Sequence, residues 1–301
     1  MNFYTICAFF YGVFATSQSI FNTKLSAVYG TWAGSGMVHA VGLLVLLPTL
    51  LTPWGKKKGS APWFDHLGGF VGILPLVFTV LAVPTTGVTI NLAMSMLGMV
   101  VFSCLADSLG LFGAEKLRLR GMKILAICVL ALGSFTMIAL SGDKLEGTLP
   151  IGLVLPLCFA GGVTLVAARV LNSRLSKKCG AGYSTLMNFL TGLIGCTVIV
   201  ACMRFQIPVR FPAAGQPWYI YIGGALGATG IFLCNVASPK LSVLQMTVIG
   251  NVGQIFTGIV IDAIIGKFSL GTIIGGAIVT IGMILNTKAD AAARAKEGRQ
   301  H

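Results

Sequence analysis

Long apolar runs constrain the fold of this chain more than any other feature of its sequence. The stretch from Leu67 to Gly113 contains a single charged residue, Asp107. A membrane-spanning helix needs about 20 predominantly apolar residues, so this stretch predicts two spans rather than one. Over the whole chain, 10% of the residues are charged, whereas soluble domains average about 25%. The sequence therefore predicts a polytopic membrane protein and excludes a soluble one.

Ten segments emerge when the apolar runs are divided at proline, glycine and clusters of charge. They cover residues 3–21, 31–52, 67–83, 88–110, 121–141, 150–171, 181–203, 217–237, 241–264 and 268–287. Turn-forming residues at 84–87 and 238–240 separate the third segment from the fourth and the eighth from the ninth. Each of these pairs is expected to form an antiparallel hairpin. The predicted fold is an all-α membrane protein with ten transmembrane helices.

The basic residues are distributed unevenly between the two sides of the membrane. If the N-terminus is cytoplasmic, 16 of the 21 Lys and Arg residues face the cytoplasm and 5 face outward. Cytoplasmic loops are typically enriched in Lys and Arg, so both termini are expected in the cytoplasm of a bacterial inner membrane. The basic residues come in small groups and are interpreted as membrane anchors. Arg169 is interpreted in the same way, with attraction of an anion as the alternative. The basic residues form no continuous face for nucleic acid.

The sequence contains an internal repeat. Residues 21–26 (FNTKLS) match residues 171–176 (LNSRLS) at an offset of 150. Three further pairs match at an offset of 155: Trp63 with Trp218, Pro84 with Pro239, and Asp107 with Asp262. Two five-helix repeats are expected, at residues 1–145 and 146–288, followed by a polar C-terminal tail at 289–301. Because each repeat has an odd number of helices, the second is inverted, an arrangement typical of secondary transporters.

Three short motifs carry a resemblance to a known family. They are Gln18, Asn22 and Leu25 near the end of the first segment, the GGxxG that opens the third and eighth segments, and GQIFTGIVID at residues 253–262. Together they resemble the YdcZ-type inner-membrane exporters of the drug/metabolite transporter (DMT) superfamily. Members of that family are often single five-helix units, and this chain resembles two units fused. The resemblance implies an EamA-like ten-helix carrier without naming a substrate.

Two carboxylates fall within the predicted spans, Asp107 and Asp262, at opposite membrane faces. Other acids, such as Asp65, are expected in loops. Ionisable groups at membrane depth are costly and are therefore functional candidates. The topology puts Arg174 on the side of Asp107 and Lys24 on the side of Asp262, which predicts two polar latches that close alternately. The alternative is that all four side chains extend to the interface.

Polar and aromatic residues nearer the middle of the predicted helices are candidates for lining a substrate cavity. They are Tyr11, Gln18, Asn91, Ser95, Phe159, Asn235, Asn251 and Gln254. The alternative for each amide or hydroxyl is a hydrogen bond between neighbouring helices, worth roughly 0.6 kcal/mol. Gly98 and Gly253 correspond across the repeat and are either close-packing points or hinges. His39 is interpreted as a packing residue, with a proton relay as the alternative.

These features favour a secondary transporter that exports a small organic metabolite or drug-like solute by alternating access. A neutral, zwitterionic or amphipathic solute is expected because no carboxylate lies at the midplane. The alternatives are a facilitative, channel-like permease without ion coupling and an integral-membrane enzyme. The scattered histidines and single cysteines supply neither a catalytic cluster nor a metal site, so no enzyme activity, metal or cofactor is expected. Expected partners are the solute, the lipid bilayer and, as a coupling ion, the proton, for a monomer or homodimer.

Overall fold

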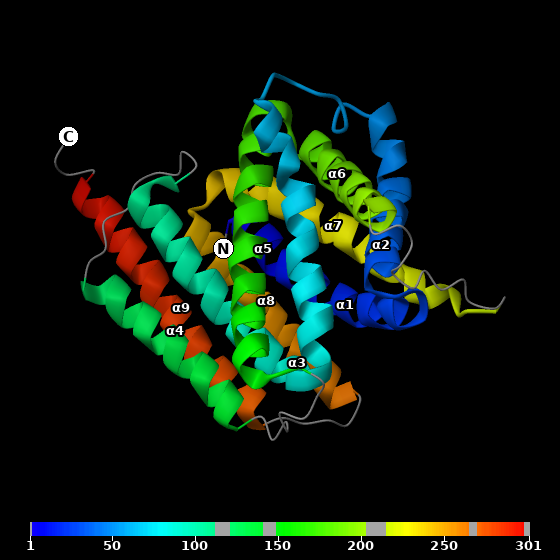
Figure 1. The fold of residues 1–301 in the computed structure, drawn as a ribbon. Helices are drawn as coiled ribbons and strands as arrows, with labels where there is room; N and C mark the ends of the chain where they lie inside the picture. The colour runs from blue at the N-terminus through cyan, green and yellow to red at the C-terminus, as the bar shows by residue number, and fades with distance from the viewer. Residues whose placement is uncertain (1, 112–120, 141–148, 203–214, 265–269, 298–301) are drawn as a thin grey trace.

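The computed structural model describes residues 2–111, 121–140, 149–202, 215–264 and 270–297. Within these ranges the chain is helical nearly throughout (Figure 1). The long helices are α1 (Phe3–Tyr29), α2 (Thr31–Leu46), α3 (Gly68–Leu109), α4 (Gly121–Ala139), α5 (Ile151–Cys179), α6 (Ala181–Cys202), α7 (Ile222–Ala237), α8 (Val243–Ile264) and α9 (Leu270–Glu297). Short 3-10 turns flank them: η1 (Leu47–Leu51), η2 (Trp63–Leu67), η4 (Trp218–Tyr221) and η5 (Ser238–Lys240).

Helix α3 contains both the third and the fourth predicted spans. Figure 1 shows that its first arm descends beside α5 and its second arm returns toward the side that holds α4 and α9. The prediction of a non-helical turn at residues 84–87 is wrong, because the backbone remains helical there. A proline in a helix removes a backbone hydrogen bond and kinks it. Thr86 also donates its hydroxyl to the Ala82 carbonyl at 3.0 Å, a bond that bends helices.

At the corresponding connection in the second repeat the helix is interrupted, as predicted, and a capping motif starts the next helix, α8. The backbone N–H of Gln245 donates to Ser242 Oγ at 3.1 Å, and the N–H of Ser242 donates to Gln245 Oε1 at 3.2 Å. This reciprocal pair is a capping box, which satisfies backbone donors at the start of α8. The first repeat has Gly87 and Ile90 at the equivalent positions and cannot form the box. The two connections differ for this reason.

The helices pack mainly against the opposite repeat. α1 packs against α7 and α8, α5 packs against α3, and α4 packs against α9. The two repeats are thus units of the sequence that interlock in space, and buried residues of both pack together in one hydrophobic cluster. Helix α9 also continues through Glu297, into the stretch predicted as a polar tail.

Two equivalent helix crossings display the inverted repeat. A Cβ atom added to Gly253 of α8 would lie 2.1 Å from the carbonyl oxygen of Phe9 in α1. A Cβ atom added to Gly98 of α3 would lie 2.1 Å from the carbonyl oxygen of Phe159 in α5. Small residues allow helix backbones to approach closely in a membrane. The contacts therefore support the close-packing interpretation of both glycines.

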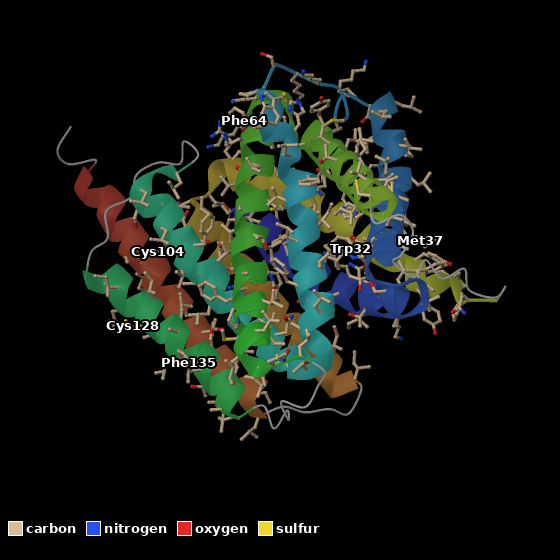
Figure 2. All side chains as sticks on the ribbon, in the orientation of Figure 1. Trp32, Met37, Phe64, Cys104, Cys128 and Phe135 are labelled. Atoms are coloured by element: carbon tan, nitrogen blue, oxygen red, sulfur yellow. The ribbon has the colours of Figure 1, made fainter. Side chains whose placement is uncertain are left out.

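Six described segments are long and apolar enough to span a bilayer. They are Thr31–Leu51, Ile90–Leu109, Ile151–Cys179, Ala181–Cys202, Trp218–Lys240 and Val243–Ile261. Shorter apolar helical stretches lie at Trp63–Thr79, Ile124–Ala139 and Ile273–Gly282. With the arms of α3 counted separately, the described residues hold the ten predicted helices. On α4, at the edge of the molecule, Cys128 and Phe135 are exposed where lipid would lie (Figure 2).

Candidate transport site

A buried guanidinium lies where helices of the two repeats meet. Arg169 of α5 is 4% exposed. Its Nη1 donates to Thr247 Oγ1 of α8 at 2.8 Å, and its Nη2 donates to Tyr11 Oη of α1 at 3.3 Å. Nη2 also lies 3.9 Å from the sulfur of Met99 in α3. The interpretation of Arg169 as an interfacial anchor is therefore wrong, because its side chain points into the protein.

Two further contacts join this arginine to its surroundings. The guanidinium carbon lies 5.1 Å from the centre of the Tyr11 ring, within the range of a cation–π interaction. Thr247 shares a hydrogen bond of 2.7 Å with Ser103, which is fully buried in α3. We call Tyr11, Met99, Ser103, Arg169 and Thr247 the polar centre. It joins α1, α3, α5 and α8, and so both repeats.

Predicted cavity residues continue from the polar centre along α3 and α8. Asn91 and Ser95 precede Met99 at intervals of four residues, so they share its face of the second arm of α3. Asn251 follows Thr247 by four residues and is fully buried. Ser95 donates its hydroxyl to the Cys158 carbonyl at 3.0 Å, as the helix-bonding alternative expects.

Several polar atoms in this region have no hydrogen-bond partner among the residues that the structure describes. They include Nε of Arg169, Oδ1 of Asn91, and both Oδ1 and Nδ2 of Asn251. A buried polar atom without a partner costs free energy comparable to a lost hydrogen bond. A solute bound near the repeat interface would therefore gain the most binding free energy, because it could form hydrogen bonds with these unsatisfied atoms.

The remaining predicted cavity residues make contacts elsewhere. Gln18 lies against α7, where its Oε1 would contact a Cβ added to Gly227. Asn235 donates to Thr185 Oγ1 at 3.0 Å, which links α7 to α6. The backbone carbonyl of Gln254 accepts a hydrogen bond from Thr16 at 3.3 Å. Among the described hydrogen bonds and ring contacts, Tyr11 is the one of the eight predicted residues that contacts the buried arginine.

His39 packs between helices of the two repeats. It is buried, and its Nδ1 lies 2.8 Å from the Ser35 carbonyl one turn earlier in α2. Its ring lies against α6, where a Cβ added to Gly192 would be 2.2 Å from it. These contacts support the interpretation of His39 as a packing residue.

Asp107 does not pair with Arg174, so the predicted inner latch is corrected. The buried carboxylate of Asp107 accepts hydrogen bonds from the backbone N–H groups of Val243 at 3.1 Å and Leu244 at 2.9 Å. These are the first residues of α8, whose N-terminal amides lack partners within the helix and favour negative charge. Asp107 of the first repeat thus caps a helix of the second.

The partner of Arg174 is Asp65, which the sequence analysis places in a loop. Asp65 lies in η2 and is fully buried. Its Oδ2 accepts a hydrogen bond of 2.9 Å from Lys178, and its Oδ1 lies 2.7 Å from Nε of Arg174 in an ion pair that lacks hydrogen-bond alignment. The guanidinium of Arg174 also stacks over Phe64, which Figure 2 labels beside the end of α5. We call Phe64, Asp65, Arg174 and Lys178 the charged corner.

The place that the internal repeat relates to the charged corner has different chemistry. Nζ of Lys24 lies 5.5 Å from the centre of the Tyr219 ring, and the hydroxyls of Tyr29 and Tyr221 are hydrogen bonded. Ile220, at the position equivalent to Asp65, is buried. We call Lys24, Tyr29, Tyr219, Ile220 and Tyr221 the tyrosine corner. The side chain of Asp262, the predicted partner of Lys24, lies outside the described part of the structure, so the outer latch stays a prediction.

Arg169, interpreted as a membrane anchor, and Asp65, expected in a loop, left signals of their burial in the sequence. Arg169 precedes the glycine that ends α5, Gly180, by eleven residues, which places it roughly 16 Å along the helix. A membrane anchor would be nearer to the helix end. Asp65 corresponds to Ile220 in the repeat, and a position that is apolar in one copy is a candidate for burial in the other. Arg174 and Lys178 are four residues apart and so share the face that meets Asp65.

Comparisons with known proteins identify the family and support the fold of the chain. The model of the family DMT_YdcZ, described as "Putative inner membrane exporter, YdcZ", matches residues 3–136 and 153–285. One solved crystal structure, titled only as that of a protein, is 15% identical, with 98% of each chain covered and a TM-score of 0.71. That likeness shows the fold alone. None of the curated proteins compared matches the chain significantly. The chain therefore belongs to the DMT_YdcZ family of inner-membrane exporters and carries two copies of the family's unit.

Proposed function

We propose that this protein exports a small organic solute by alternating access between its two inverted repeats. The observation that carries the proposal is the set of unsatisfied polar atoms beside the polar centre, where helices of both repeats meet. Transporters with inverted repeats hold their substrates near the membrane midplane at the repeat interface. The charged corner and the tyrosine corner are the two contacts that would open in turn. With the predicted cytoplasmic termini, the charged corner faces the cytoplasm.

A facilitative permease without ion coupling is the second candidate. The two carboxylates whose side chains are described, Asp65 and Asp107, both hold structural partners: cations at the charged corner and amides at the start of α8. Proton coupling would have to break one of these contacts, or use Asp262. Release of solute from proteoliposomes with and without a pH gradient distinguishes the two candidates.

A disulfide across the repeat interface tests alternating access. A Cβ added to Gly36 of α2 would lie 3.6 Å from the Cβ of the native Cys196 in α6, close to the mean separation of about 3.8 Å in disulfides. Gly36→Cys should therefore form a bridge to Cys196 when oxidised. Because this bridge lies toward the tyrosine corner, it should hold that entrance closed.

The assay uses proteoliposomes loaded with a small-molecule extract of the host cell, and mass spectrometry of the released solutes. Oxidation of Gly36→Cys should reduce release at least tenfold, and a reductant should restore it. Gly36→Ala is the matched control, since it adds the same Cβ without a thiol. Unchanged release from the verified disulfide would contradict alternating access, and no release from the unmodified protein would contradict export.

A further inference from the structure

The polar centre contains a positive charge without a described carboxylate partner. Neither ion pair of the described residues involves Arg169. The carboxylate of Asp107 binds the amides of Val243 and Leu244, one helical turn before Thr247 on α8. The hydrogen-bond partners of the guanidinium are two hydroxyls and one thioether. Burial of an unpaired charge is costly, so its retention calls for a partner that the described residues do not supply.

The donors that surround Arg169 are suited to an oxyanion. A guanidinium presents five N–H donors in a planar fork that matches a carboxylate or phosphate. Nε has no hydrogen-bond partner within the described ranges, which leaves an edge of that fork unsatisfied. The Tyr11 hydroxyl accepts from Arg169, so its own proton is available to donate. Nδ2 of Asn251, one turn along α8 from Thr247, is a further buried donor without a partner.

We propose that Arg169 binds an anionic group, a carboxylate or phosphate, of the exported solute, with Tyr11 and Asn251 as additional hydrogen-bond donors. This inference rests on the transport role proposed above and narrows its substrate class. The sequence analysis expects a neutral, zwitterionic or amphipathic solute because no carboxylate lies at the midplane. The buried guanidinium of Arg169 points instead to an anionic group on that solute. The Tyr11 ring beside the guanidinium suits a solute that also carries an apolar or aromatic part.

An anionic substrate accounts for export with few coupling groups. An inside-negative membrane potential drives anions outward, by about 50-fold in concentration per elementary charge for each 100 mV. Export of an anion therefore needs no proton exchange. The two described carboxylates can keep their structural contacts throughout transport.

Thermal unfolding of the purified full-length protein tests binding. The probes are benzoate and phenyl phosphate as anions, benzamide as a neutral analogue, benzylamine as a cation, and inorganic phosphate as a simple ion. At saturating concentration, at least one aromatic anion should raise Tm by about 4 °C or more, and benzamide and benzylamine should not. A larger shift in Tm with benzoate would indicate a carboxylate site, and a larger shift with phenyl phosphate would indicate a phosphate site. Equal stabilisation by benzamide, or no anion-dependent shift, would overturn the inference.

Variants of Arg169 separate a binding role from a structural one. Arg169→Met removes a buried charge without a carboxylate partner, so it should fold with an unchanged or higher Tm and lose the shift with anions. Arg169→Lys keeps the charge without the fork and should keep a reduced shift. If Arg169 only ties helices together, Arg169→Met should lower Tm and Arg169→Lys should show no shift, which would overturn the inference.

The proteoliposome assay distinguishes failure of this inference from failure of the transport role. The solutes released by the unmodified protein should be mainly anions, and Arg169→Met should abolish their release. Release of neutral or cationic solutes that persists in Arg169→Met would overturn the inference and leave export standing. Arg169-dependent binding of benzoate or phenyl phosphate without release of any solute would leave an anion site and overturn export.

Discussion

The charged corner and the tyrosine corner are each formed by both repeats, are related by the internal repeat, and are held by different forces. Both place a cation over an aromatic ring, Arg174 over Phe64 at 5.4 Å and Lys24 over Tyr219 at 5.5 Å. Beside this shared contact, the first repeat buries an aspartate and the second buries Ile220. The same backbone arrangement can thus be closed by an ion pair at one corner and by apolar packing at the other. The two entrances can therefore differ in strength and in salt dependence although the fold is nearly symmetric.

The substitution with the largest expected effect on this comparison introduces an aspartate into the tyrosine corner. Ile220→Asp would bury a carboxylate where the nearest described cation, Lys24, is exposed and engaged with a ring. An unpaired buried charge costs about 3–5 kcal/mol, so the variant should lose most of its folded yield and unfold at a much lower temperature in detergent.

A second substitution should partly rescue this variant. Val28 is the repeat equivalent of Lys178, and Val28→Lys with Ile220→Asp would rebuild the ionic arrangement of the other corner. Recovery of Tm in the double variant would support the equivalence of the two corners. Normal stability of Ile220→Asp alone would contradict the burial on which the comparison depends.

Neutralising the aspartate in its native corner should have a smaller effect. Asp65→Asn leaves Arg174 and Lys178 without their counter-ion, but their side chains are 25% and 40% exposed and can reach solvent. The expected loss of stability is about 2 kcal/mol, below that of a fully buried pair. Cys179 is fully buried at this corner, with its thiol 3.4 Å from the Gly59 carbonyl. Maleimide should therefore label it faster in Asp65→Asn.

This labelling needs a background without the two exposed cysteines, Cys128 and Cys202. Lys177→Gln is the matched control, because Lys177 precedes Lys178 and belongs to neither described ion pair. It should leave the labelling rate of Cys179 unchanged. An equal rise in both variants would mean that Asp65 does not hold this corner closed.

The smallest effect is expected at the tyrosine corner. Tyr29→Phe removes one hydroxyl from the bond with Tyr221 and leaves the ring contact, with centroids 6.3 Å apart, in place. The loss should be about 0.5–1.5 kcal/mol, the net contribution of one hydrogen bond, and should be insensitive to salt. Thermal unfolding at low and high ionic strength measures it. Tyr4→Phe is the control, and a salt-dependent loss in Tyr29→Phe would contradict the distinction between the corners.

The sequence predicted the helices and the repeat well because both depend on local composition and spacing. The polar centre was harder to predict, because which side of a helix faces inward depends on its rotation against distant helices. Arg169 and Arg174 lie five residues apart on α5, yet one is buried among hydroxyls and the other pairs with Asp65. The capping box at Ser242 and Gln245 follows the sequence pattern S-x-x-Q and could be predicted from it. Because the first repeat lacks this pattern, helix α3 continues there.

The interlocking of the two repeats has a consequence for how the chain is made. Helix α1 is synthesised first, yet its main partners, α7 and α8, begin at Ile222 and Val243. At synthesis rates of about 5–20 residues per second, α1 would wait roughly 10–40 s for them. Its polar residues, including Asn22 and Ser26, would spend that interval without their final neighbours. The early membrane intermediate is therefore the stage at which this protein most depends on the insertion machinery or on temporary pairing among its own first five helices.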